Sequence, residues 1–286
     1  MRAVTLYIPS YNVAATLAPT IEGALAQTYP IAEILVINDG STDATVEIAS
    51  RYAGRNVRVV NHAKNRGLAA ARNTAFAEAK TELVAALDGD CIAHPEWLAT
   101  LVAYLEDPTI VAAGGRLIET VLNCTADRFR KCYMNQDWGL SVRRDPQFMY
   151  GNNSVMRREA VLAAGGYDER HRTNGEDFAV SQNLAKAGWH TVYDPQATVR
   201  HLRSDTTRSV LEGFWRYWRF GYRFHYPVDL PRLLFFVARH FPAHLARMLR
   251  RREWSLSTLD VLALDLYLPF YMAWREVGLY REAKAS

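Results

Sequence analysis

The stretch that decides the fold is Leu83-Val-Ala-Ala-Leu-Asp88-Gly-Asp90-Cys-Ile, in which five apolar residues lead directly into two carboxylates. A continuous apolar run bounded by polar residues is typical of a strand buried on both faces, as in a parallel sheet. The two acids then lie at the carboxyl end of that strand, where open α/β sheets bind their ligands. Alternatively, Asp88-Gly-Asp90 is only a surface turn, because these residue types are common in turns.

The spacing of the two acids suits a cation. Side chains at positions i and i+2 of an extended segment point the same way, so Asp88 and Asp90 can converge on one ion. Carboxylate oxygens favour Mg²⁺ or Mn²⁺, held jointly with substrate phosphates. Gly89 between them lets the backbone turn tightly and lets a bulky ligand approach.

Three further apolar runs precede this stretch, and each is followed by a segment with helical spacing. The runs lie at 4–8, 33–37 and 57–60. Strand and helix alternating at this spacing predict a parallel sheet with right-handed crossovers. The loops after the strands then share one edge of the sheet, which brings Asp39 and Arg66 near the two acids. Turn chemistry explains any one of these loops but not their common edge.

The composition is that of an ordinary globular protein, since 49% of the 286 residues are hydrophobic and 22% are charged. This length suffices for one large α/β domain and an appendage. The three cysteines form no Cys-x-x-Cys pair, which indicates a reducing compartment and no structural zinc. The chain opens with a strand-like run and shows no signal peptide, so we expect a cytoplasmic protein.

The polar segments together form an ordered set that resembles family 2 glycosyltransferases of the GT-A fold. The set consists of Pro9-Ser-Tyr-Asn12, Val36-Ile-Asn-Asp39-Gly-Ser-Thr-Asp43, Asn65-Arg-Gly-Leu-Ala-Ala-Ala-Arg72-Asn73, Asp88-Gly-Asp90, Gly151-Asn-Asn-Ser154, Gly165-Gly-Tyr-Asp-Glu169 and Gly175-Glu176-Asp177. Each motif is weak alone, but the ordered set is specific and covers roughly the first 200 residues. The Gln-x-x-Arg-Trp of processive members is not found, so the chain resembles the non-processive members, and the resemblance implies an inverting type.

The resemblance implies a fold class and a domain organisation. The fold would be α/β, a GT-A (Rossmann-like) mostly parallel sheet flanked by helices, with a C-terminal helical appendage. We expect the catalytic domain at 1–205, with a nucleotide half at about 1–90 and an acceptor half at about 91–205. Residues 206–286 would form the appendage.

The resemblance also implies roles on the donor side. Asp90 would bind the metal ion, Mn²⁺ or Mg²⁺, and Asp88 would contact the ribose or share the ion. Asp39 would accept a hydrogen bond from the nucleotide base, unless it only fixes its own loop as an Asx turn. His201 follows a strand-like run and resembles a histidine that completes the metal or diphosphate site, although a lone histidine there is usually structural.

Four more residues are expected around the nucleotide. Pro9 and Tyr11 would form the wall for the base. Arg66 and Arg72 lie near the same edge and would touch the base or a phosphate. Either arginine could equally be an ordinary solvated helix charge.

On the acceptor side, Asp177 is the expected general base. An inverting transfer needs one carboxylate to remove the proton of the acceptor hydroxyl, and Gly175-Glu176-Asp177 fits a helix start facing the cleft. The alternative is that acids are favoured there by the helix dipole alone. Glu176 would hydrogen-bond acceptor or donor hydroxyls, while Gly151, Asn152 and Asn153 would shape the acceptor side of the cleft.

The C-terminal part differs in charge from the rest. Residues 1–199 carry 19 Lys and Arg against 22 Asp and Glu, whereas residues 200–286 carry 15 against 8. In Phe214–Tyr226 aromatics alternate with arginines, so that on a helix Trp215, Trp218 and Tyr222 share one face. A last helix is expected from Ser257 through Trp274, and Arg250-Arg-Arg252 precedes it.

Two interpretations of this basic, aromatic region stay open. Aromatic and arginine-rich helices suit the headgroup layer of an anionic membrane, which predicts peripheral contact at the inner face of the cell membrane. The same helices could instead pack on the catalytic domain or on a second copy of the chain in a homo-oligomer. Nothing else in the sequence supports nucleic-acid binding, so we expect no nucleic-acid partner.

Three functional hypotheses follow. The first is an inverting, metal-dependent glycosyltransferase that moves a sugar from a nucleotide diphosphate donor to a glycan or lipid-linked hydroxyl. The resemblance favours a UDP-sugar, although Asp39 can also accept from guanine. The second is a non-catalytic sugar-nucleotide-binding subunit of a membrane glycan-synthesis complex, which would be expected to lack Asp90 or Asp177; both are present. The third, a nucleotidyltransferase, would need a glycine-rich phosphate loop where Pro9-Ser-Tyr-Asn12 stands.

Overall fold

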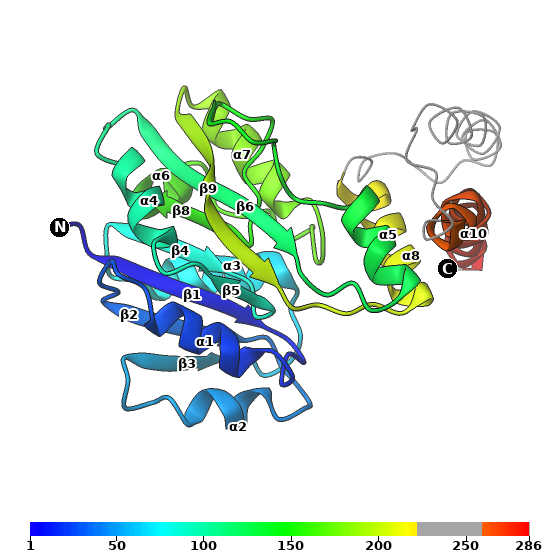
Figure 1. Ribbon diagram of the computed structural model, residues 1–286, viewed down its shortest axis with the longest axis horizontal. Helices are drawn as coiled ribbons and strands as arrows, with labels where there is room; N and C mark the ends of the chain where they lie inside the picture. Colours follow the sequence, from blue (N-terminus) through cyan, green and yellow to red (C-terminus); the bar gives the residue numbers. More distant parts are fainter. Residues whose placement is uncertain (222–258, 286) are drawn as a thin grey trace. The chain divides into compact units, whose positions relative to one another are not determined.

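The computed structural model describes residues 1–221 and 259–285 and divides into two compact units (Figure 1). The sheet unit comprises residues 1–120 and 136–203, and the helical unit comprises residues 121–135 and 204–286. The units therefore interleave in sequence. The segment 121–135 belongs to the helical unit, whereas the sequence placed it in the acceptor half, because contacts between distant helices decide its membership.

The sheet unit is built on one sheet of nine strands, and its predicted α/β class is confirmed. The strands are β1 (Val4–Ser10), β2 (Glu33–Asn38), β3 (Val57–Asn61), β4 (Leu83–Leu87), β5 (Cys91–Ala93), β6 (Ile110–Glu119), β7 (Arg143–Arg144), β8 (Asn153–Arg157) and β9 (His190–His201). Their order is β3-β2-β1-β4-β8-β6-β9-β5, with β7 paired to β9. The first four strands are mutually parallel, as predicted, while β8 runs antiparallel between β4 and β6.

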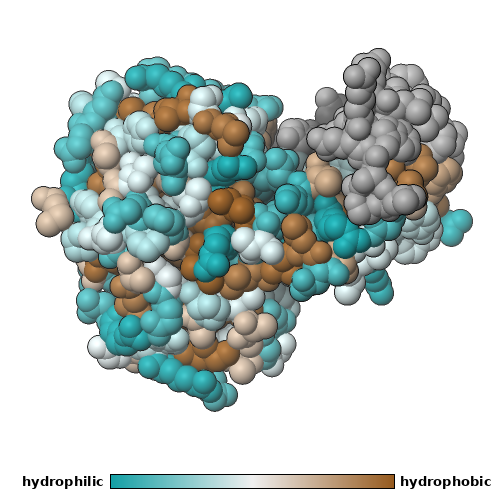
Figure 2. Space-filling view, viewed as in Figure 1, coloured by the Kyte–Doolittle hydropathy of each residue, from teal (hydrophilic) through white to brown (hydrophobic). Residues whose placement is uncertain are grey.

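Helices cover both faces of the sheet, because the central strands are apolar on both sides. They are α1 (Leu17–Leu25), α2 (Thr45–Ser50), α3 (Leu68–Glu78), α4 (Trp97–Tyr104), α6 (Arg158–Ala163) and α7 (Glu176–Lys186). Leu6 of β1 packs in a core with α1, α2 and α4, whereas the adjacent Tyr7 packs with α3, α6 and α7. Successive side chains thus enter opposite cores, as the period of a strand requires. On the face that Figure 2 shows, this unit's surface is largely hydrophilic with small hydrophobic patches.

The strand register brings several strand ends to one edge. Ser10 at the end of β1 pairs with Asn38 at the end of β2, and β4 ends beside them at Leu87. Because β8 is antiparallel to β4, its first residue, Asn153, pairs with Leu87. The last residue of β9, His201, pairs with Cys91 of β5. The loops that carry the predicted site residues therefore meet at this edge.

The helical unit contains α5 (Thr125–Tyr133), α8 (Thr207–Arg216), the short π-helix η1 (Tyr217–Gly221) and α10 (Leu259–Ala285). A capping box between Thr206 and Ser209 begins α8. Phe129, Leu211, Trp215 and Leu268 are part of its apolar core. None of the helices within the described part of the chain is long and apolar enough to cross a membrane.

The predicted aromatic face of the first tail helix is found in part. Trp215 is buried and Trp218 packs against the same core, while Tyr222 lies outside the described residues. Arg250, Arg251 and Arg252 also lie outside them. The last helix is observed as α10, and Pro269 lies within it.

Candidate active site

Arg72 occupies the centre of the site, although the sequence left open whether it was a solvated helix charge. The alanine-rich helix α3 places it against the sheet, where it is 1% exposed. Its Nη1 donates to the Tyr7 hydroxyl at 3.0 Å and to the Gly151 carbonyl. Its Nη2 lies 3.3 Å from Asp88 Oδ1, and its Nε lies 3.3 Å from Glu176 Oε1. The solvated alternative is therefore wrong for Arg72, which links four elements of the unit.

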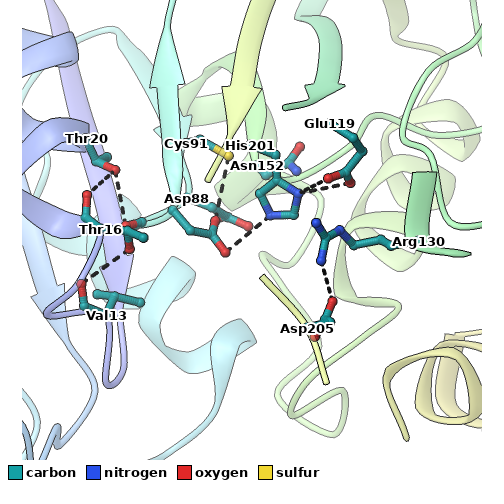
Figure 3. Close-up of polar contacts among 12 residues, drawn as sticks. Val13, Thr16, Thr20, Asp88, Cys91, Glu119, Arg130, Asn152, His201 and Asp205 are labelled. Atoms are coloured by element: carbon teal, nitrogen blue, oxygen red, sulfur yellow. Dashed lines mark hydrogen bonds and ion pairs between the residues drawn. The ribbon is translucent and has the colours of Figure 1, made fainter. Parts of the chain in front are cut away.

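Asp88 follows β4 directly and retains partial access to solvent. Its side chain is 28% exposed, while Arg72 beside it is 2% exposed. Burial raises the pKa of Asp88 to about 6, although the positive charge of Arg72 acts in the opposite direction. A Cβ at Gly89 next to it would be tightly packed, 3.1 Å from Val13 and 3.3 Å from the Pro9 carbonyl. Thr16, which precedes α1, and Thr20 of α1 both donate to the Gly89 carbonyl, at 2.7 and 3.1 Å, and so fix the loop (Figure 3).

Asp90 and His201 form the second polar group of the site. His201 Nε2 lies 3.3 Å from Asp90 Oδ2, and its Nδ1 lies 3.0 Å from both carboxylate oxygens of Glu119 (Figure 3). Burial works to raise the pKa of Asp90, but the hydrogen bond and charge of His201, together with the charge of Arg203, hold that pKa below its usual range. Burial works to lower the pKa of His201, but hydrogen bonds to Asp90 and Glu119 raise it to about 9.

This donor set fits a divalent cation. Asp90, Cys91 and His201 each offer one ligand atom, and these atoms lie within 4.8 Å of one another. A carboxylate and an imidazole are suitable ligands for a first-row divalent ion. The second nitrogen of the imidazole is held by a carboxylate, which is the usual arrangement behind a metal-bound histidine. Glu119 was missed from the sequence, because only the register of β6 on β9 pairs it with His201.

Asp39 is bound mainly by its own protein. Its Oδ1 accepts from the backbone N–H of Arg66 at 2.8 Å and lies 2.7 Å from His62 Nδ1, while its Oδ2 accepts from Gly67 N–H at 2.8 Å. It is 3% exposed. Asp39 therefore fixes the loop that leads into α3, which is close to the alternative that it only fixes its own loop. Its Oδ2 retains one lone pair that can accept from a further donor.

The other predicted donor-side residues lie at the same edge with different exposure. Pro9 is buried within β1, and Tyr11 after it is 49% exposed. Arg66 is half-exposed, and its Nη2 lies 3.4 Å from Glu169 Oε2. Arg66 is therefore accessible from solvent, unlike Arg72.

Asp177 and Glu176 begin α7 after Gly175, which adopts a left-handed conformation with φ 91°. Asp177 Oδ2 accepts from Gly151 N–H at 3.3 Å, and its Oδ1 accepts from Phe178 N–H at 2.8 Å. Burial raises the pKa of Asp177, against the effect of Arg72. Burial, together with the charge of Asp177, raises the pKa of Glu176 to about 8.

Glu176 and Asn153 differ from the sequence expectation. Glu176 is 3% exposed and faces Arg72, so its side chain makes an internal contact where the sequence predicted a contact with substrate hydroxyls. Asn153 is fully buried and accepts from Trp97 Nε1, so it supports the core rather than the acceptor side. Asn152 is 5% exposed, and its amide donates to Gln136 at 2.6 Å. The sequence could not predict that these three side chains point inward, because each lies within a motif expected at the site.

Gly151 is needed because of Arg72. A Cβ at this position would lie 2.7 Å from the guanidinium, which no side chain could tolerate without displacing it. The Gly151 carbonyl accepts from Arg72, and its N–H donates to Asp177. One peptide segment thus connects the buried cation to the candidate base.

A separate pocket of about 560 Å³ lies at the opposite edge of the sheet, near the start of β4 and the end of β8. Of its cationic lining residues Lys80, Arg157 and Arg158, Arg157 is already bound by Glu82 and by the carbonyls of Ile110 and Leu105.

The chain is similar in sequence to several known proteins. The family model for glycosyl transferase family 2 matches residues 5–162. Glycosyltransferase AglE of Haloferax volcanii is 28% identical over 197 residues, covering 66% of this chain and 64% of that protein. The putative glycosyltransferase EpsE of Bacillus subtilis is 35% identical over 209 residues, covering 71% of this chain and 73% of that protein. The pre-mycofactocin glycosyltransferase of Mycobacterium tuberculosis is 30% identical, and the match spans only 43% of its length.

Solved structures support the fold. The mannosyltransferase PcManGT from Pyrobaculum calidifontis, solved with GDP-Man and Mn²⁺, superposes with a TM-score of 0.58 at 21% identity, covering 98% of this chain and 75% of that one. GalNAc-T7, solved with UDP, GalNAc and Mn²⁺, gives a TM-score of 0.60 at 19% identity, covering 95% of this chain and 56% of that one. Both are GT-A glycosyltransferases. From the family match, the relatives and the shared fold, we conclude that the chain belongs to glycosyltransferase family 2.

Proposed function

We propose that this protein is a non-processive, inverting, metal-dependent glycosyltransferase that transfers a sugar from a nucleotide diphosphate donor to a hydroxyl of a glycan or lipid-linked acceptor. The observation that carries the proposal is the position of Arg72, which contacts Asp88 and the carbonyl of Gly151. The N–H of Gly151 in turn donates to Asp177. A leaving-group site and a base are thus built around one fixed cation. An inverting displacement needs the leaving-group site and the base to be held at a fixed distance and orientation.

The metal side of the reaction would rest on Asp90 and His201, with Asp88 beside them. When bound, Mn²⁺ or Mg²⁺ supplies Lewis-acid neutralisation of the charge on the diphosphate leaving group. Glu119 orients the imidazole of His201, and Thr16 and Thr20 hold the backbone between the two aspartates. The relatives solved with Mn²⁺ support a divalent cation.

Asp177 would act as the general base. Its pKa is raised by burial, which brings it closer to neutral pH, where a carboxylate base is most effective. Glu176 holds its proton at neutral pH because its pKa is about 8, so the pair carries one negative charge rather than two. That charge resides on Asp177, whose two oxygens are oriented by Gly151 and Phe178.

Asp39 and Tyr11 would recognise the nucleobase of the sugar-nucleotide donor. The remaining lone pair of Asp39 Oδ2 can accept from an N–H of uracil or of guanine, and the exposed ring of Tyr11 offers a face for stacking. We propose uridine, following the family resemblance. The solved relatives bind GDP-Man in one case and UDP in the other, so both bases are tested.

A panel of UDP- and GDP-sugars tests the proposal. Each is incubated with the protein and Mn²⁺, and release of nucleoside diphosphate is measured with and without EDTA. One active donor, with activity lost in EDTA and in Asp177→Asn, supports the proposal. A protein that binds a nucleotide sugar without turnover under any of these conditions would instead be a non-catalytic binding subunit.

A further inference from the structure

The carboxylate of Asp39 is almost saturated with hydrogen bonds from its own chain. Its Oδ1 accepts from the Arg66 N–H at 2.8 Å and lies 2.7 Å from His62 Nδ1, and its Oδ2 accepts from the Gly67 N–H at 2.8 Å. An ionised carboxylate offers about four lone-pair sites, two on each oxygen. Both sites of Oδ1 are therefore occupied, and the one site that is left belongs to Oδ2.

His62 is the member of this set that the proposed reaction does not use. Its side chain is 6% exposed, and that of Asp39 is 5% exposed. Because an ionised carboxylate only accepts hydrogen bonds, Nδ1 of His62 carries a proton and donates to Asp39. The other ring nitrogen, Nε2, lies 2.9 Å from the Thr74 hydroxyl of α3, so the ring is held at both ends.

The backbone on both sides of this contact is closely packed. The N–H of His62 donates to the Asn38 carbonyl at 2.9 Å, next to the pairing of β2 with β3. Gly40 adopts a left-handed conformation with φ 72°, and a Cβ there would lie 2.6 Å from the carbonyl carbon of Lys64. The loop that carries His62 thus lies directly against the backbone that carries Asp39, and its donors hold the carboxylate in one orientation.

Nucleobases differ in the number of N–H groups that they present to a carboxylate. Guanine presents two adjacent groups, the ring N1–H and one N–H of the 2-amino group, which together need a free lone pair on each oxygen. Uracil presents one ring N–H between two carbonyl groups. Oδ2 of Asp39 can meet that single donor, whereas the second donor of guanine would meet Oδ1, whose lone pairs are occupied. A donor that loses water without gaining an acceptor weakens binding.

We propose that His62 determines the choice of donor base, because it leaves Asp39 a single free acceptor site. The site then takes a base with one ring N–H between two carbonyl groups, uracil or thymine, and discriminates against guanine. His62 acts through Asp39 and does not touch the base, so it is a positioning residue. This inference rests on the proposed function, in which the nucleobase of the donor lies against Asp39.

Equilibrium binding of nucleoside diphosphates tests this choice. The parent is titrated with UDP, GDP and IDP in the presence of Mn²⁺, so that the diphosphate and the metal ion are common to all three. IDP is the decisive probe, because hypoxanthine keeps the size and the N1–H of guanine but lacks the 2-amino group. We expect IDP to bind about tenfold more tightly than GDP, and UDP to bind more tightly than GDP.

The failure of this inference differs from the failure of the proposed function. GDP that binds as tightly as IDP, or more tightly, overturns the inference and leaves the transfer reaction intact, since a GDP-sugar can then be the donor. A parent that binds none of the three nucleotides contradicts both. The titration of the parent is sufficient for this decision, even where a variant does not fold.

Two substitutions at His62 separate recognition of the base from support of the fold. His62→Leu keeps a side chain of similar size but removes the donor, so one lone pair of Oδ1 is freed and the carboxylate can turn toward a second N–H. The preference for IDP over GDP should then be lost. His62→Asn places an amide N–H where Nδ1 stood, and it should restore the preference. A merely structural role would lower the stability of the variants and leave the preference unchanged.

A matched control breaks a similar contact elsewhere in the sheet unit. His190 begins β9, whose other end carries His201, and its Nδ1 lies 2.9 Å from Asp145 Oδ2. His190→Leu should leave the dissociation constants of all three nucleotides unchanged. Circular dichroism melting checks that each variant is folded. An unchanged preference for IDP in folded His62→Leu overturns the role of His62, as does loss of the preference in folded His62→Asn.

Discussion

Arg72 and Glu176 lie next to each other in the interior of the sheet unit, with Arg72 Nε 3.3 Å from Glu176 Oε1 and the two side chains only 2% and 3% exposed. The same guanidinium lies 3.3 Å from Asp88. The pair therefore joins α3 and α7 to the end of β4, which places the donor side and the base side of the site on one rigid connection.

Arg72→Met should destabilise the protein by about 3–5 kcal/mol, because it leaves buried acidic partners without their cation. The double variant Arg72→Met/Glu176→Gln should recover part of that loss, since it also removes the buried carboxyl group that lies against Arg72. Arg66→Met removes a half-exposed cation and should cost less than about 1 kcal/mol. Urea unfolding of the parent, Arg72→Met, Glu176→Gln and the double variant measures the coupling. Strict additivity of the two single changes would show that Arg72 and Glu176 do not interact.

Asp177→Asn should lower kcat by roughly 10²-fold or more while donor affinity persists, because the amide keeps the shape but cannot accept a proton. Initial rates and equilibrium binding of the active nucleotide sugar measure the two quantities. Glu106→Gln, a change at a side chain that is 71% exposed, serves as the control and should leave both unchanged. If Asp177→Asn weakens donor binding and leaves kcat unaltered, Asp177 is a binding residue.

Glu176 should make the stability depend on pH in a defined direction. Its pKa is 4.5 when unperturbed and about 8 in the folded protein, so between these values the folded state holds a proton that the unfolded state has lost. Raising the pH across this window therefore destabilises the parent relative to Glu176→Gln. The difference in free energy of unfolding between variant and parent should grow from pH 5 to pH 8. A constant difference would mean that Glu176 is ionised in the folded protein.

Metal binding should compete with a proton on His201. Without a metal ion, Asp90 and Glu119 hold the pKa of His201 at about 9, and a metal-bound imidazole must be neutral. Mn²⁺ affinity should consequently rise as pH increases from 6.5 to 8.5, with proton release visible in calorimetry as a dependence on the buffer. Asp90→Ala and His201→Ala should each abolish this binding, and Asp88→Ala should reduce activity nearly as much as Asp90→Ala. An Mn²⁺ affinity that does not change with pH, or activity that survives EDTA, would contradict the assignment of a metal ion to this site.

The sequence predicted the parts of the fold that local patterns determine. The run Leu83–Leu87 is β4 with those same bounds, and the expected helix start at Gly175-Glu176 is that of α7. The burial of Arg72 could not be predicted in the same way, because its partners come from β1, β4, α7 and the loop before β8. The pairing of Glu119 with His201 depends on strand register, and the burial of Asp265 and Glu276 depends on which side of α10 meets α5 and α8.

The measurement that tests the central claim most directly is proton NMR of the sugar released from the active donor during the first minutes of reaction. A donor whose sugar is α-linked to the diphosphate should give the β-anomer first, before mutarotation, because water or acceptor attacks the face opposite the leaving group with Asp177 as base. Initial release of the α-anomer would contradict an inverting displacement and the role assigned to Asp177.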